Sequence, residues 1–119
     1  MDGLELICFE IISNVGMARS CFINSIQEAQ IGNFNKAYQL IEDGNEHFVK
    51  GHHAHANLIK EEARGNLEKT PLLLIHAEDQ LMSAESFKIL ANELIKICKN
   101  NYELKSQVDR LQEFLNTSK

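Results

Sequence analysis

Apolar residues recur every three or four positions along almost the whole chain. Residues that break helices gather in only two places, around positions 30–33 and 64–70, and divide the chain into three long stretches. A spacing of three and four places apolar side chains on one face of an α-helix, and no stretch shows the strict alternation of a half-buried strand. The pattern therefore predicts an all-α fold with three helices joined by short loops.

The first two stretches each carry a complete apolar seam. The seam of the first consists of Leu4, Cys8, Ile11, Val15, Ala18, Phe22, Ser25 and Ala29. The seam of the second, which Asn33 is placed to cap, consists of Phe34, Ala37, Ile41, Gly44, Phe48, Gly51, His55 and Leu58. A glycine inside a helix costs about 1 kcal/mol against alanine. Gly44 and Gly51 therefore predict a close helix contact or a groove for a partner.

The third stretch has the longest seam. Thr70 is expected to cap this helix, with Pro71 at the first helical position, where its missing N–H costs nothing. The seam consists of Leu73, His76, Gln80, Ser83, Phe87, Leu90, Leu94, Ile97, Asn101, Leu104, Val108, Leu111 and Leu115. Such a sustained alternation of three and four is typical of helices packed with a left-handed twist. We expect one domain over residues 1–119, an antiparallel up-down-up three-helix bundle laid out like a spectrin repeat.

Residues 101–119 keep this seam while the rest of their surface becomes polar. We read them as a C-terminal extension of the third helix that projects from the bundle or pairs with copies of itself.

Charge and composition narrow the function. The net charge of −5 argues against a nucleic-acid partner, which would require a basic stripe. No stretch reads as a membrane span, and the N-terminus lacks the basic region of a signal peptide. The three cysteines are far apart in apolar surroundings, as expected of buried thiols in a reducing compartment. A cytoplasmic protein is expected.

Polar residues interrupt the third seam at three consecutive positions, His76, Gln80 and Ser83, and Asp79 lies beside them. One buried polar residue often only fixes the register of packed helices, but three in a row cost stability unless each finds a partner. In a hairpin centred near residues 65–66, His55 of the second helix should lie within about one turn of His76. This polar cluster favours a functional site.

Three kinds of chemistry could use such a cluster. Histidines crowd the second helix at positions 47, 52, 53 and 55, but neither a Glu-x-x-His repeat nor an HExxH motif is present. A histidine–metal protein using His55 and His76 stays open as a lesser alternative. No Ser/His/Asp grouping suggests a hydrolase. An imidazole, with an ordinary pKa of about 6.5, can instead accept a phosphoryl group without any organic cofactor.

Four collinear stretches carry a family resemblance. Residues 72–84 (LLLIHAEDQLMSA) resemble the LLLVHAQDHLMTA motif of enzyme IIA of the lactose/cellobiose (and diacetylchitobiose) family of the sugar phosphotransferase system (PTS). Residues 16–20 resemble its GxARS, residues 32–37 its GDFxKA, and residues 52–63 its HxxQTxLIxxEA. The resemblance covers about residues 5–100 in the right order.

The resemblance implies a homotrimer of three-helix subunits. It implies that His76 accepts phosphate from phospho-HPr and passes it to a cysteine of enzyme IIB, which phosphorylates a β-disaccharide entering through the permease IIC. Lactose, cellobiose or diacetylchitobiose would be such a sugar. Asp79 matches the aspartate that meets its symmetry mates on the trimer axis around a metal ion, and Mg²⁺ or a similar divalent cation would suit it.

The chain departs from the family motifs near this cluster. The family's Gln and Thr are His55 and Ala56 here, while Glu78 replaces a glutamine and Gln80 a histidine. We hypothesise that His55 takes over hydrogen bonding from the missing glutamine and that its protonation tunes the stability of phosphate on His76. His52 also matches a family position near the site and is expected to be accessory to it.

Two questions stay open at this level. Arg19, within the GxARS match, either pairs with a carboxylate across the bundle or contacts the phosphate. The departures also leave room for a divergent helical module of the same fold that regulates or binds without transferring phosphate.

Overall fold

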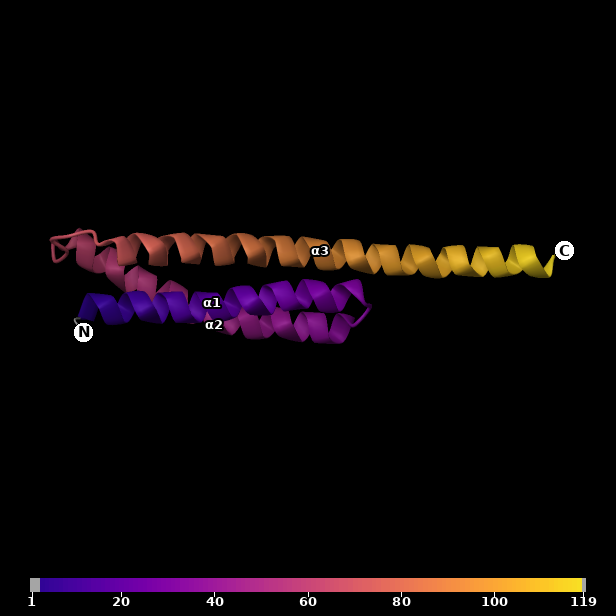
Figure 1. Cartoon of the computed structure of the whole chain (residues 1–119), viewed down its shortest axis with the longest axis horizontal. Helices are drawn as coiled ribbons and strands as arrows, with labels where there is room; N and C mark the ends of the chain where they lie inside the picture. Colours follow the sequence, from indigo (N-terminus) through magenta and orange to yellow (C-terminus); the bar gives the residue numbers. More distant parts are fainter. Residues whose placement is uncertain (1–2, 119) are drawn as a thin grey trace.

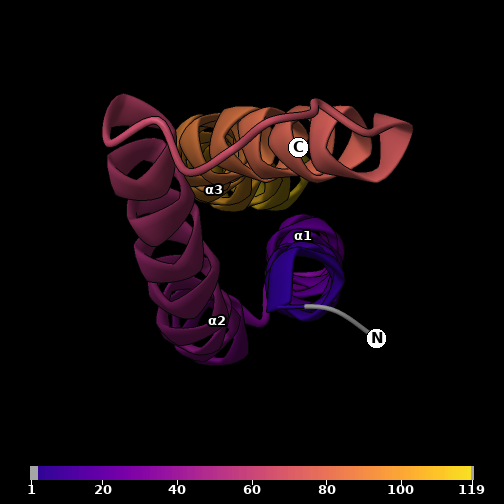
Figure 2. The same ribbon diagram turned by 90° about the vertical axis from the view of Figure 1, so that its left-hand side faces the viewer.

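Three long helices make up the computed structural model, which describes residues 3–118. They are α1 (Gly3–Gln30), α2 (Phe34–Ala63) and α3 (Leu72–Thr117), and no strand occurs among the described residues. Helices α1 and α3 run side by side in one direction while α2 returns antiparallel to them, and the end-on view shows the three packed around a common core (Figures 1 and 2). The expected up-down-up three-helix bundle is confirmed.

Helix α1 contributes the central face of the core, because it packs extensively against both other helices. Every position of its predicted seam from Cys8 to Ala29 is buried, and Leu4 packs at the edge. The buried residues of α2 are Ala37, Gly44, Gly51, Ala54 and Leu58. His55 is only half-buried, and its neighbour Ala54 occupies the core in its place.

The predicted seam of the third helix is wrong in its rotation about the helix axis. The residues of α3 that are buried each follow a predicted seam position by one: Ala77, Leu81, Ala84, Ala91 and Ile95. One residue corresponds to about 100° around a helix. The alanines allow α3 to approach α1 closely, whereas Leu90, Leu94 and Ile97 are exposed in the protomer. Helix α3 therefore carries two apolar faces, and only the one with smaller residues faces the bundle.

Helix α1 is long and apolar enough, by length and composition alone, to cross a membrane, contrary to our expectation from sequence. The face of α1 that is buried against α2 and α3 explains part of this composition, because core helices of soluble proteins have similar sequences. This apolar character is weak evidence for a membrane location.

Gly44 and Gly51 let α2 lie directly against α1. A Cβ atom at Gly44 would fall 2.7 Å from Cε1 of the buried Phe22 ring, and one at Gly51 would fall 2.6 Å from Cγ1 of Val15. Neither neighbour can move freely, because both are fully enclosed in the core. Of the two explanations considered for these glycines, the structure supports close helix approach.

We expect Gly44→Ala and Gly16→Ala to change stability in opposite directions. Alanine is favoured over glycine inside a helix by about 1 kcal/mol, and nothing lies within 4 Å of a Cβ placed at Gly16. At Gly44 the clash with Phe22 should add an overpacking cost of about 1–3 kcal/mol. Urea unfolding of both variants measures the difference. Equal stabilisation by the two substitutions would contradict the close contact.

The turn between α1 and α2 is fastened by Glu28. Asn33 is the N-cap residue of α2 as expected, but its side chain does not cap the helix. The Asn33 amide instead donates a hydrogen bond of 2.8 Å to Oε2 of Glu28, and Lys36 Nζ lies 3.4 Å from Oε1. The Asn33 hydrogen bond, together with Lys36, lowers the pKa of the Glu28 carboxyl group. The charged form of Glu28 therefore supports the turn at neutral pH, and this support is lost as the pH falls through the lowered pKa.

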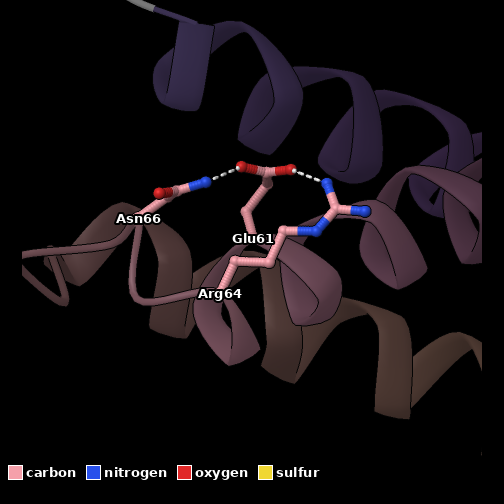
Figure 3. Close-up of polar contacts among 3 residues, drawn as sticks. All are labelled: Glu61, Arg64 and Asn66. Carbon is pink, nitrogen blue, oxygen red and sulfur yellow. Dashed lines mark hydrogen bonds and ion pairs between the residues drawn. The ribbon is translucent and has the colours of Figure 1, made fainter.

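The loop between α2 and α3 is held by Glu61, whose carboxylate accepts hydrogen bonds from Arg64 Nη1 (3.1 Å) and Asn66 Nδ2 (2.7 Å) (Figure 3).

Thr70 was expected to cap α3 with Pro71 as its first residue, and this is wrong by one position. Pro71 has an extended backbone with ψ of 156° and is itself the N-cap, so the helix begins at Leu72. This loop sets the register that brings the two helices together at the candidate site.

Candidate functional site

His76 lies near the start of α3 with an exposed imidazole. It borders an open hollow together with Leu72 and Leu73, and it makes no hydrogen bond or ion pair with another described residue. The prediction that His76 faces the core is wrong, because the neighbouring Ala77 takes that position. An exposed ring without a partner is nevertheless what a nucleophile needs if it is to be reached by another protein.

A guanidinium group contacts the helical turn that follows His76. Gln80 follows His76 by four residues, and on a helix such residues are neighbours with Cβ atoms about 5–6 Å apart. Nη1 of Arg19, from α1, donates a 3.0 Å hydrogen bond to Oε1 of Gln80. Among the residues described, Arg19 forms no ion pair with a carboxylate. The guanidinium is therefore half-buried beside the site with its charge uncompensated by direct contact.

His55 contacts Glu78 of α3 rather than His76. The His55 Nε2 and Glu78 Oε1 atoms form an ion pair when the imidazole is protonated, with the His55 side chain 13% exposed and that of Glu78 48%. The predicted hairpin register is thus correct to within one turn. Both residues are departures from the family motifs, and they contact each other. Their equal distance from the loop was the signal in the sequence that could have paired them.

Replacing both members of this pair should be less harmful than the single changes suggest. We expect His55→Gln and Glu78→Gln to show a coupling of about 0.2–1 kcal/mol, the range measured for partly exposed ion pairs. A double-mutant cycle by urea unfolding at pH 6 measures this coupling. Strictly additive effects would mean that the contact contributes nothing to the docking of α2 on α3.

His52 and Ser83, the other residues expected at or near the site, lie on different surfaces. The His52 ring stacks on Phe48 with centroids 6.2 Å apart, and it borders a second hollow together with His55 and Glu85. His76 does not border this second hollow. Ser83 is half-buried on α3, about two turns beyond His76. The site around His76 therefore draws on α1 and α3, through Arg19 and Gln80, more than on the histidines of α2.

Within the described part of one chain, no three His, Cys, Asp or Glu side chains come together as metal ligands. A metal centre built on His55 and His76 thus gains no support, since His55 is engaged with Glu78. Asp79, the residue that follows Glu78, is exposed. It offers one carboxylate per chain, so a hard cation there would need carboxylates from other copies.

Comparisons with known proteins show the family to which this chain belongs. The family model of the PTS system, Lactose/Cellobiose specific IIA subunit, matches residues 6–99. The chain belongs to this family. A lactose-specific EIIA component of Staphylococcus epidermidis is 36% identical over 98 residues, which cover 82% of this chain and 94% of that protein.

Two solved structures are also similar. The cellobiose-specific enzyme IIA of Bacillus anthracis has a TM-score of 0.83 and 37% identity, covering 87% of this chain and 94% of that one. The IIA(Chitobiose)–HPr complex of Escherichia coli has a TM-score of 0.74 and 26% identity, covering 86% and 99%. This EIIA is therefore a component of a sugar phosphotransferase relay, and its fold is that of the family. Within this fold, α1 buries one face against the other two helices.

Proposed function

We propose that this EIIA is a phosphoryl carrier that accepts phosphate on His76 from phospho-HPr. The observation that carries the proposal is an exposed, unpartnered imidazole within the family motif on α3. An imidazole nitrogen attacks the phosphorus, and a P–N bond to His76 forms as the bond to HPr breaks. A cysteine thiolate of enzyme IIB then attacks the same phosphorus, so that His76 leaves as a neutral imidazole after taking up a proton.

Arg19 and Gln80 suit the phosphorylated state. A phosphoryl group on His76 carries up to two negative charges and several acceptor oxygens, which a guanidinium matches with paired N–H donors. The Arg19 hydrogen bond to Gln80 holds this cation one turn from His76 without neutralising it. The Gln80 amide and the Ser83 hydroxyl are further donors on the same helix.

The partners follow from the relay. A chitobiose-type IIA forms a complex with HPr, which supports HPr as the donor for this chain, with enzyme IIB as acceptor and the permease IIC acting indirectly. Proteins named for lactose, cellobiose and chitobiose are each 26–37% identical in sequence to this chain. We assign the sugar only as a β-disaccharide of this class. A cytoplasmic location fits the relay, and no nucleic acid takes part.

We further propose that the working form is a homotrimer. The exposed Leu90, Leu94 and Ile97 on α3 support association between copies along this helix. Asp79 flanks the same surface, and carboxylates from several copies would repel one another unless a cation or protons neutralised them. A carboxylate set of this kind suits Mg²⁺ or a similar hard divalent cation, which would hold the copies together there.

Incubating the protein with phosphoenolpyruvate, enzyme I and HPr tests the proposal. Intact mass measured under neutral to basic conditions should show the gain of one phosphoryl group per chain. Addition of a cognate enzyme IIB should then remove the group. No gain from an active HPr would instead favour the divergent, non-transferring module that the substitutions at His55, Glu78 and Gln80 leave open.

A further inference from the structure

Helix α3 continues well beyond the bundle. Its 46 residues would span about 69 Å at the usual helical rise, and the molecule is 79 Å long but only 19 × 18 Å across. The Tyr102 ring meets Phe34 edge-on at 5.7 Å, and every described residue after Cys98 is exposed. Figure 1 shows this last part of α3 standing clear of the ends of α1 and α2. We call residues 101–118 the tail.

The tail carries an apolar stripe that nothing in the protomer covers. Leu104, Val108, Leu111 and Leu115 are spaced by four, three and four, and are exposed by 57%, 56%, 63% and 61%. The same alternation begins in the bundle, where Leu90, Leu94 and Ile97 precede Asn101. Helices that supercoil around each other in a left-handed sense have this seam of alternating a and d positions. The stripe is therefore continuous over both parts of α3.

A second copy of the chain is the occupant that fits the stripe. A helical segment with no packing partner gains little stability in water, because most helical stability in proteins comes from packing an apolar face. The tail has three acidic and two basic residues up to Ser118, so identical tails would scarcely repel one another. The family match ends at residue 99, so the tail lies beyond the part that the family model covers.

We propose that the tails of identical chains form a parallel, in-register coiled coil. In this arrangement Asn101 of each copy meets Asn101 of the others, where the amides can hydrogen-bond and fix the register. An antiparallel overlap of α3 that keeps seam positions paired would instead set Leu111 and Leu115 against Gln80 and His76, burying polar groups against leucine. The parallel form also places every His76 at the same end of the assembly. The proposal does not depend on phosphoryl transfer.

Leu111→Asp in the full chain tests the self-association, with Ser106→Asp as its control. Both substitutions add one negative charge to the tail, but Ser106 lies away from the seam. Sedimentation equilibrium over a range of concentrations should show an oligomer for the parent and Ser106→Asp. The concentration at which Leu111→Asp dissociates should be at least about tenfold higher, since burying a charge without a partner is costly. A monomeric parent, or identical behaviour of the two variants, would overturn the proposal.

The orientation has its own test. Oxidation of Leu111→Cys should join two chains through position 111, whereas Ser106→Cys and the parent, whose own cysteines are at least partly buried, should stay uncrosslinked. In a parallel, in-register pair the two 111 positions face each other, within the range a disulfide can bridge. Failure of Leu111→Cys to crosslink in a chain that is still oligomeric would overturn the parallel arrangement.

Discussion

Replacing His76 with alanine should abolish the gain of a phosphoryl group from phospho-HPr and, with it, sugar uptake that depends on this EIIA. The proposed reaction needs a nucleophilic nitrogen at this position, and no other described histidine occupies the same hollow. The protein should otherwise remain intact. The imidazole is exposed and makes no polar contact, so its removal should change stability by no more than about 0.5 kcal/mol.

His53→Ala is the matched control for this experiment. His53 is also an exposed histidine, but it lies on α2 away from α3, near Lys50 and Asn57. This variant should accept phosphate as the parent does. Intact mass after incubation with phosphoenolpyruvate, enzyme I and HPr distinguishes the outcomes. Full phosphorylation of His76→Ala would move the acceptor to another residue and refute the assignment.

The number of helices could be read from the sequence, and so could the buried face of α1, because the regular seam from Cys8 to Ala29 is the face that packs in the core. Helix α3 has two apolar faces, and the spacing of large residues favoured the wrong one for the protomer. Ala77, Ala84 and Ala91 make the contacts within the bundle, yet alanine is a weak hydrophobic signal beside Leu90 or Leu94. Which face meets which neighbour depends on tertiary packing, and periodicity alone does not determine it.

The candidate site was predictable where it depended on the hairpin. Equal distance from the loop brought the right turns of α2 and α3 together, so His55 was expected near His76 and in fact contacts Glu78. The contact between Arg19 and Gln80 had no such signal. It joins α1 to α3 over 61 residues of sequence, and the packing of a first helix on a third is set by the whole core.

Substituting Arg19 with glutamine should shift phosphate away from this EIIA and back toward HPr. A charge-assisted hydrogen bond contributes about 1.5–3 kcal/mol, and each 1.4 kcal/mol is a factor of ten in an equilibrium constant. We therefore expect the ratio of phosphorylated to free EIIA, at a fixed ratio of phospho-HPr to HPr, to fall by about tenfold or more. Quantitative intact mass of both proteins after equilibration measures it.

Lys36→Gln is the control, because it removes the same unit charge at the turn between α1 and α2, where Lys36 pairs with Glu28. If Arg19 acts only through the net charge of the protein, the two variants should shift the equilibrium equally. If it contacts the phosphoryl oxygens, Arg19→Gln should have the larger effect. Arg19→Lys should then fall between the parent and Arg19→Gln, since lysine keeps the charge but not the paired N–H donors. An unchanged equilibrium in Arg19→Gln, with urea stability preserved, would leave Arg19 a purely structural link to Gln80.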